Sequence, residues 1–318
     1  MKSQSISSIL VIGNNHISSS ILQALTTEPR YTVSLLTHPS HTPFLSRKTD
    51  PVLVKHYKVK LSDFAALTAA FKGQDLVIST GSGGDFELQA RIIDAAIAAG
   101  VARFIPAEFG HDSRNERVQE RLPPSKQRAL VIEYLQSKAI EGDIEWTALA
   151  VGVLLDERLR SGDLGFELAW QSATVHGTGD EHFAATSFER VGVAVASILL
   201  RWEDVKDRYL YCSGCSVTAN EIVRALEKVT GKEWTVGYHE VAECVREGKS
   251  RIEKGFPDAG MFLMERSVLY DEELGAFEAF EREDAKRSLG LKEEVLEEMV
   301  KGVVHQFKHY GKGDCGCG

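Results

Sequence analysis

The sequence has few cysteines and no long hydrophobic run, and each absence excludes a class of protein. Five cysteines in 318 residues are an odd number in a long chain, which argues against a disulfide framework and favours a reducing compartment. The longest apolar stretches, around residues 147–155 and 191–200, are shorter than the roughly 20 residues that a membrane-spanning helix needs. Residues 1–13 contain one lysine and a short apolar run, too little for a signal peptide. We therefore expect a cytoplasmic protein without a membrane span.

Positive charge is also scarce. The chain has 37 Lys and Arg residues against 46 Asp and Glu residues, which gives a formal net charge of −9. We expect no nucleic-acid partner, because binding to a phosphate backbone requires a basic face. The 43% hydrophobic and 26% charged residues are typical of a globular chain that buries a core. At roughly 150 residues per domain, the length fits one large unit or two.

Short β-rich segments alternate with amphipathic, helix-length segments through the first half of the chain. Strands are expected at Ser8–Ile12, Tyr31–Leu36, Pro51–His56, Asp75–Thr80, Arg103–Pro106 and Glu145–Val151, and helices at Ile17–Leu25, Phe64–Phe71, Leu88–Ala99 and Gln127–Ser137. This alternation predicts the α/β class, with a Rossmann-type, doubly wound parallel sheet covered on both faces. Ligands of such sheets bind beyond the C-terminal ends of the strands.

The alternation loosens after about residue 151. Glycine-rich segments at 161–166 and 177–180 are followed by an expected helix at Phe188–Leu200, a strand at Arg208–Cys212, a helix opened by the capping box Thr218–Glu221 and a charged helix at Glu293–Phe307. The glycine-rich tail, residues 311–318, is expected to be disordered. No linker separates the two halves, so we expect the second part to pack on the first.

The loop after the first expected strand occupies the phosphate-binding position of a dinucleotide fold, but most of the usual glycines are missing. Three glycines there provide a tight turn, a close approach of the pyrophosphate and close packing of helix on strand. The same frame reads Gly13, Asn15 and Ser18 here. Asn tolerates a left-handed backbone and Ser is small, so the turn can form, although their side chains narrow the space for a pyrophosphate. A turn without a ligand is the alternative interpretation.

The end of the second expected strand lacks the residues that usually select between NAD and NADP. An acid there binds the ribose 2′-hydroxyl, and an arginine binds a 2′-phosphate. The sequence offers Thr37 and His38, with Arg47 and Lys48 further along the loop. His38 can donate to a phosphate, although an ordinary pKa near ~6.5 leaves a histidine mostly neutral at pH 7. The missing acid favours NADP over NAD, and a solvent-exposed loop histidine is the alternative for His38.

One segment resembles a known family closely. Its most specific part is residues 103–110, RFIPAEFG, inside a longer match over residues 75–112, DLVISTGSGGDFELQARIIDAAIAAGVARFIPAEFGHD. The segment resembles the isoflavone reductase-like (NmrA-like) family, which are atypical members of the short-chain dehydrogenase/reductase superfamily. Weaker similarity extends over most of the chain.

The resemblance implies an NADP(H)-binding Rossmann domain, which we place at residues 1–155, and a smaller substrate-binding part formed mainly by residues 156–318. It also implies a small-molecule substrate, an aromatic or enone-type secondary metabolite. The oligomeric state, a homodimer included, is left open. The residues that the resemblance places at the nicotinamide end of the cleft are Ser79, Thr80, Gly81, Pro106 and Phe109.

In the reductases of this family, a lysine at the start of the helix after the octapeptide handles the proton. That position is most simply occupied by Arg128, which has apolar residues three, six and seven positions later. Arginine cannot act as a neutral base, but it can hold a carbonyl or an oxyanion electrostatically. Lys126 recovers the usual role if the helix begins differently. His111 and Asp112 follow the octapeptide, where either can contact substrate or accept a proton.

Other constellations are expected to be structural. Cys212 and Cys215 form a CxxC without a second pair at metal-ligand spacing, and His176 and His182 are expected in a surface loop and match no metal motif, so no metal site is expected. Tyr134 and Lys138 match the Tyr-x-x-x-Lys spacing of classical short-chain dehydrogenases, but Tyr134 lies on the apolar register of its helix.

The depleted glycine loop, His38 and Arg128 all depart from the family pattern in the regions that bind phosphate and move protons. Three functions are therefore open. The chain is an NADPH-dependent reductase, a redox-neutral isomerase or cyclase that uses the same cleft, or a regulator that senses NADP without chemistry.

Overall fold

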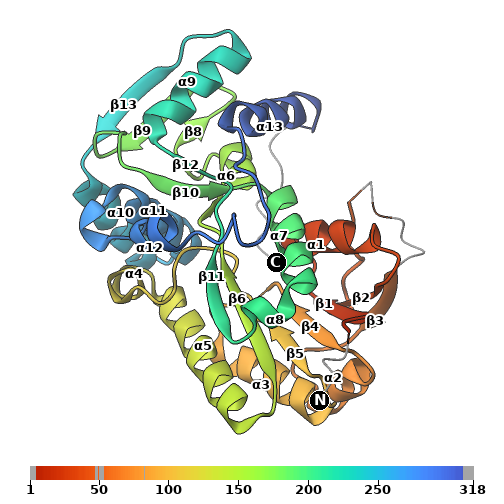
Figure 1. Ribbon diagram of the computed structural model, residues 1–318. Helices are drawn as coiled ribbons and strands as arrows, with labels where there is room; N and C mark the ends of the chain where they lie inside the picture. The colour runs from red at the N-terminus through yellow and green to blue at the C-terminus, as the bar shows by residue number, and fades with distance from the viewer. Residues whose placement is uncertain (1–4, 47–48, 50–53, 82, 311–318) are drawn as a thin grey trace.

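A seven-stranded parallel sheet forms the centre of the molecule in the computed structural model, which describes residues 5–46, 49, 54–81 and 83–310 (Figure 1). The strand order is β11-β6-β5-β4-β1-β2-β3. The strands are β1 (Ser8–Ile12), β2 (Thr32–Thr37), β3 (Val54–Lys58), β4 (Leu76–Ser79), β5 (Arg103–Ile105), β6 (Glu145–Ala150) and β11 (Arg208–Tyr211). The order reverses beside β1, which places the start of the following helix at a switch point of the sheet.

Helices cover both faces of this sheet, as the alternating sequence predicts. One face packs against α1 (His16–Thr26), α7 (Phe188–Leu200) and α8 (Trp202–Val205), and the other against α2 (Phe64–Phe71), α3 (Phe86–Ala98) and α5 (Pro123–Glu141). Side-chain caps fix where several helices begin: Asn15, Asp63, Asp85 and Ser187 each accept a hydrogen bond from a backbone N–H in the first turn. Within the described residues, no helix combines the length and the apolar character needed to cross a bilayer.

The sequence predicts most strands and helices of the first half, but it does not predict the short helix α4 (Glu116–Arg121), and two further differences concern a helix and a strand. The helix expected at Gln127–Ser137 is longer, because Pro123 and Pro124 occupy its first positions, where a missing N–H costs nothing. The seventh strand, β11, comes from beyond residue 155 and pairs with β6, so the central sheet is not built from residues 1–155 alone. Residues 51–53 of the strand expected at Pro51–His56 and the tail 311–318 lie outside the described residues.

The remaining elements form a smaller part above the C-terminal ends of the central strands (Figure 1). Two three-stranded sheets have the orders β12-β10-β7 and β13-β9-β8. The strands are β7 (Val153–Leu154), β8 (Phe166–Glu167), β9 (Ser172–His176), β10 (Phe183–Thr186), β12 (Cys215–Val217) and β13 (Thr235–His239), and the helices are α4 (Glu116–Arg121), α6 (Leu155–Ser161), α9 (Ala219–Thr230), α10 (Val241–Glu253), α11 (Pro257–Tyr270), α12 (Glu278–Glu283), α13 (Leu296–Tyr310) and the 3-10 helix η2 (Glu272–Leu274). The predicted capping box is present at the start of α9.

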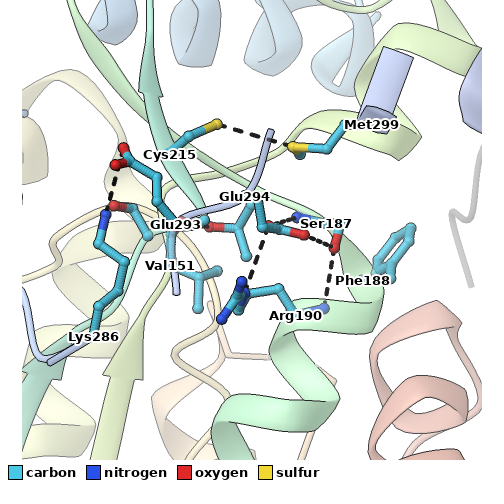
Figure 2. A network of polar contacts seen from close by, with 12 residues as sticks. Val151, Ser187, Phe188, Arg190, Cys215, Lys286, Glu293, Glu294 and Met299 are labelled. Atoms are coloured by element: carbon cyan, nitrogen blue, oxygen red, sulfur yellow. Dashed lines mark hydrogen bonds and ion pairs between the residues drawn. The ribbon is translucent and has the colours of Figure 1, made fainter. Parts of the chain in front are cut away.

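The segment before α13 is fastened to the start of α7, as Figure 2 shows. Glu294 accepts hydrogen bonds from the backbone N–H of Ser187 at 3.0 Å and from its hydroxyl at 2.6 Å, and Arg190 lies 3.9 Å away. The Ser187 hydroxyl in turn accepts from the N–H of Arg190 and caps α7. This network fixes the start of α7, where Phe188 contacts His16 after the loop that follows β1.

Candidate active site

The loops after β1 and β4 meet at the C-terminal edge of the sheet. The Thr80 hydroxyl donates to the carbonyl of Ile12 at 2.8 Å, and the Asn15 side chain donates to the carbonyl of Thr80 at 2.9 Å. Gly13 has a φ of 140°, and a Cβ at this position would overlap the Thr80 hydroxyl. Gly13 is therefore required by its contact with Thr80, whether or not a ligand approaches.

The first turn of α1 is capped from within and covered by an imidazole. Asn15 and Ser18 form a reciprocal capping box, so both residues serve the helix start in this structure. The ring of His16 stacks on Phe188, with centroids 5.0 Å apart, and meets Phe44 edge-on at 4.7 Å. Burial, together with the nearby Arg160, lowers the pKa of His16 to about 4. His16 is therefore neutral at pH 7.

The loop after β2 folds toward the same helix start. The Asn14 side chain accepts from the N–H of Phe44 at 2.7 Å and donates to the carbonyl of Thr42 at 3.1 Å. Thr37 is buried and its hydroxyl lies 2.8 Å from Nε2 of His56, while His38 is exposed and bonds to Ser40. Arg47 and Lys48 lie outside the described residues.

The groups present at the start of α1 fit a dinucleotide pyrophosphate. The backbone N–H groups of His16 and Ile17 have no acceptor among the described residues, as is usual for the first positions of a helix. The Arg160 guanidinium lies beside the His16 ring, with Nη2 3.1 Å from Nε2. Two N–H donors and a cation are the chemistry that a phosphate requires.

The residues implied for the nicotinamide end lie along β4 and β5. Ser79 is buried and points its hydroxyl at no partner among the described residues, and the carbonyl of Gly81 accepts from the Gln89 side chain at 2.8 Å. Pro106 follows β5, and Phe109 is 8% exposed in the core between the sheet and α7. β4 and β5 are hydrogen-bonded neighbours, so these segments leave the sheet side by side.

Arg128 neutralises a buried carboxyl group of the octapeptide. Glu108 is 2% exposed, accepts from the Tyr209 hydroxyl at 2.7 Å and lies 3.9 Å from Nε of Arg128. Burial outweighs the guanidinium and raises the pKa of Glu108 to about 7. Arg128 also donates to the Ser125 hydroxyl at 2.9 Å, whereas Lys126 is exposed.

His111 is the predicted residue that reaches a cavity. Its Nε2 lies 3.3 Å from Glu265 Oε1, and Arg158 donates to Glu265 Oε2 at 2.6 Å. Burial alone would raise the pKa of Glu265, but Arg158 and His111 outweigh it and hold the pKa near 2. A permanently ionised carboxylate therefore orients the His111 ring from α11.

The cavity beside His111 has a volume of about 180 Å³ and lies between the two parts of the molecule. Its walls are mostly apolar, with Phe183, Leu269, Phe277 and Phe280 among them. His182 also lines it and lies parallel to Phe277, with ring centroids 6.3 Å apart. Neither Arg128 nor Lys126 belongs to its lining.

Sequence reasoning missed several residues of this site. Glu265 and Arg158 orient His111, and Phe277 forms a wall, but none stands in a recognisable motif. His111 and Glu265 are separated by 154 positions in the sequence, so their spacing gives no signal.

The remaining sequence candidates lie in structural roles. The Tyr134 hydroxyl bonds to Asp94 at 2.5 Å and Lys138 to Glu141 at 2.6 Å, on the outside of α5. Burial raises the pKa of the Cys212 and Cys215 thiols to about 12, which leaves them unreactive. The expected surface loop is wrong for His176, which ends β9 and is 6% exposed because β13 and α11 cover it.

Comparisons with known proteins agree with this architecture. Oxidoreductase aprR of Aspergillus flavus is 37% identical over 249 residues, which span 78% of this chain and 82% of that protein. A crystal structure of isoflavone reductase superposes with a TM-score of 0.73 at 19% identity, over 94% of this chain and 99% of that one. The complex of AtPrR2 with NADP⁺ and (+)pinoresinol has a TM-score of 0.73 at 20% identity and the same coverage.

The model of the NmrA-like family matches residues 5–300, which is nearly the whole described chain. The match includes the octapeptide at residues 103–110, the loop after β1 and the elements that carry His111 and Glu265. The fold is that of the isoflavone reductase-like structures. This chain belongs to the NmrA-like family.

Proposed function

We propose that the protein is an NADP(H)-dependent oxidoreductase that reduces a small aromatic or enone-type molecule. The observation that carries the proposal is the position of His111. His111 lines an apolar cavity and directly follows the octapeptide, whose Pro106 and Phe109 come after the end of β5. NADPH, when bound beyond the C-terminal ends of β4 and β5, supplies the hydride. The oxidoreductase names of the relatives and the NADP⁺ complex of a structural neighbour support this choice.

His111 provides the proton in this account. Glu265 binds Nε2, so this nitrogen keeps its proton, and Nδ1 has no hydrogen-bond partner among the described residues. Nδ1 can therefore exchange a proton with a ligand in the cavity, while the Glu265 carboxylate holds the ring in position. The apolar walls exclude water from the reacting atoms.

Arg128 takes the position of the family lysine but not its proton chemistry. Its Nε lies 3.9 Å from Glu108 Oε2 and its Nη2 donates to the Ser125 hydroxyl, so the guanidinium ties Glu108 of the octapeptide to the start of α5.

The test is NADPH oxidation with a panel of acceptors, namely chalcone, cinnamaldehyde and menadione, with product analysis. We expect one equivalent of NADPH to be consumed for each product formed. His111→Asn should lower kcat by about 10²-fold and leave the Kd for NADPH unchanged, because the ring acts only on the cavity ligand. Lys301→Gln, on an exposed side chain of α13, is the matched control and should keep wild-type turnover. Conversion of an acceptor without NADPH oxidation would contradict the proposal.

A redox-neutral isomerase or cyclase is the second candidate. The observation that favours it is the pairing of His111 with Glu265 at the cavity, which can move protons without a nucleotide. Only one of the three usual glycines is retained in the loop after β1, which also favours a reaction that does not use the nucleotide. If the protein is an isomerase or cyclase, turnover should be equal with and without NADPH. If it is an oxidoreductase, no turnover should occur when NADPH is omitted.

A further inference from the structure

The cavity beside His111 carries negative charge in its walls. Three of its side chains are carboxylates, Asp271, Glu272 and Glu278, and the described residues that line it include no lysine or arginine. The three come from the stretch between the end of α11 and the start of α12. His111 and His182 are the other titratable side chains of the described lining. A ligand in this cavity therefore meets carboxylates on one side and no permanent cation.

Neighbouring arginines neutralise only part of this charge. Arg121 donates to Asp271 at 2.8 Å, which compensates that carboxylate. Arg282 lies 3.5 Å from Glu278, but both side chains are about 67% exposed, so this ion pair contributes little. Glu272 has no lysine or arginine nitrogen within 4.0 Å in the part of the chain that the structure describes. Glu272 is therefore the carboxylate that is left for a ligand.

The apolar walls suit both an aromatic ring and a cation. Phe183, Phe277 and Phe280 line the cavity, and the faces of aromatic rings attract positive charge. The volume is about 180 Å³, and a cavity of roughly 150 Å³ is enough to hold benzene. One ring thus fits inside, and its substituent reaches the rim, where Glu272 and Glu278 are exposed.

The residue that exchanges protons lies apart from these carboxylates. His111 is 6% exposed, and its Nδ1 has no hydrogen-bond partner among the described residues, so a polar atom of a ligand belongs beside it. Its ring is held by Glu265, which is six positions before Asp271 and therefore about 9 Å away along α11. His111 and Glu272 are thus placed to contact different parts of one ligand.

We infer that the substrate is an aromatic molecule that carries a protonated amine, with its ring among the phenylalanines, its reacting end at His111 and its ammonium group at Glu272. This inference rests on the proposed function, since it takes the cavity as the substrate site. It makes Glu272 a specificity-determining residue. A substrate with a carboxylate in place of the amine is disfavoured by like charge.

The experiment compares three benzylideneacetones that differ only in the para substituent: dimethylaminomethyl, which is protonated at pH 7, hydroxymethyl, which is neutral, and carboxylate. NADPH oxidation by the full chain gives kcat/KM, and calorimetry gives the Kd of each compound. We expect the amine to exceed the carboxylate by about 10-fold in both, with the alcohol between them. The difference should shrink at high ionic strength, because Glu272 is exposed and salt screens its charge.

Substitutions at Glu272 test the assigned contact. Glu272→Gln should lower the amine-to-alcohol ratio about 3- to 5-fold, and Glu272→Lys should make the carboxylate the preferred compound. Glu273→Gln is the matched control, because it removes the same charge from the next residue of η2, which does not line the cavity. It should keep the wild-type ratio. Circular dichroism melting checks that the variants are folded.

The outcomes separate the inference from the proposed function. Equal kcat/KM for the three compounds, or a ratio that Glu272→Gln leaves unchanged, would overturn the inference and leave the oxidoreductase standing. Equal losses in Glu272→Gln and Glu273→Gln would also overturn it, since the preference would then come from the general field of the surface. Selective binding of the amine without NADPH oxidation would overturn the proposed function and leave the ligand chemistry standing.

Discussion

At the residue scale, the site depends on two positions, Gly13 after β1 and His111 after the octapeptide. Gly13 was singled out because a tight turn needs glycine, and the structure adds that Thr80 leaves no room for a side chain there. His111 was expected at the mouth of the cleft and lines the cavity. Glu265 could not be predicted, because its contact with His111 depends on how α11 packs against α4, far away in the sequence. The contacts between the predicted cofactor-binding residues and a nucleotide remain predictions.

Glu108 makes the stability of the protein depend on pH. Its pKa is raised from 4.5 to about 7 by burial, so the unfolded chain loses this proton at lower pH than the folded chain. The contribution is fully present below about pH 4.5 and is lost as the pH rises to about 7. Between about pH 5 and about pH 8, the free energy of unfolding of the wild type should therefore fall by about 2 kcal/mol more than that of Glu108→Gln.

Urea denaturation at the two pH values measures this difference. Glu120→Gln, on an exposed side chain of α4, is the control and should follow the wild type at both. Parallel pH profiles for the wild type and Glu108→Gln would show that the carboxyl group has an ordinary pKa in the folded protein.

At the element scale, apolar periodicity and capping residues predict several helices well, whereas they do not predict the short strands. The helix at Phe64–Phe71 and the helix at Phe188–Leu200 have the predicted bounds, because apolar spacing and a capping residue agree there. The two- to five-residue strands β7 to β10 carry too few residues for a pattern, and tertiary pairing decides them. The helices α10 and α11 were missed, since their charged and apolar residues mix without a clear boundary.

The contact between α1 and α7 depends on a glycine. A Cβ on Gly192 would overlap the backbone carbonyl of Ser20, so Gly192→Ala must push two helices apart. We expect a loss of about 1–3 kcal/mol in the free energy of unfolding, measured by chemical denaturation. Gly302→Ala, in α13, meets open space and should instead stabilise by about 0.5–1 kcal/mol through helix propensity. Equal effects of the two substitutions would refute the close contact.

The network in Figure 2 fastens the C-terminal segment to α7. Glu294→Ala leaves the Ser187 N–H without its acceptor and should cost about 2–3 kcal/mol of stability. The neighbouring Glu293 is 66% exposed and lies 3.9 Å from Lys286, so Glu293→Ala should change stability by less than about 0.5 kcal/mol. Thermal denaturation of the pair checks this, and a similar midpoint for both variants would argue against an anchoring role.

At the scale of the whole molecule, the α/β class and the doubly wound sheet follow from the alternation of strands and helices, and the structure confirms both. The sequence predicts β11 as a strand but not as part of the central sheet, because the local sequence does not determine which strand it pairs with. The same limit applies to the site. His111 and Phe277 come from separate segments and line one cavity, and Glu265 of α11 contacts His111 from a third segment.

The central claim is that the loop after β1 and the segment after β5 border one crevice that binds NADP(H). Hydrogen–deuterium exchange of the full chain, with and without saturating NADPH, tests it most directly. The account predicts slower exchange together in residues 13–18 and 106–111, with no change in the distant helix α9. Unchanged exchange in both segments, or protection confined to one of them, would contradict it.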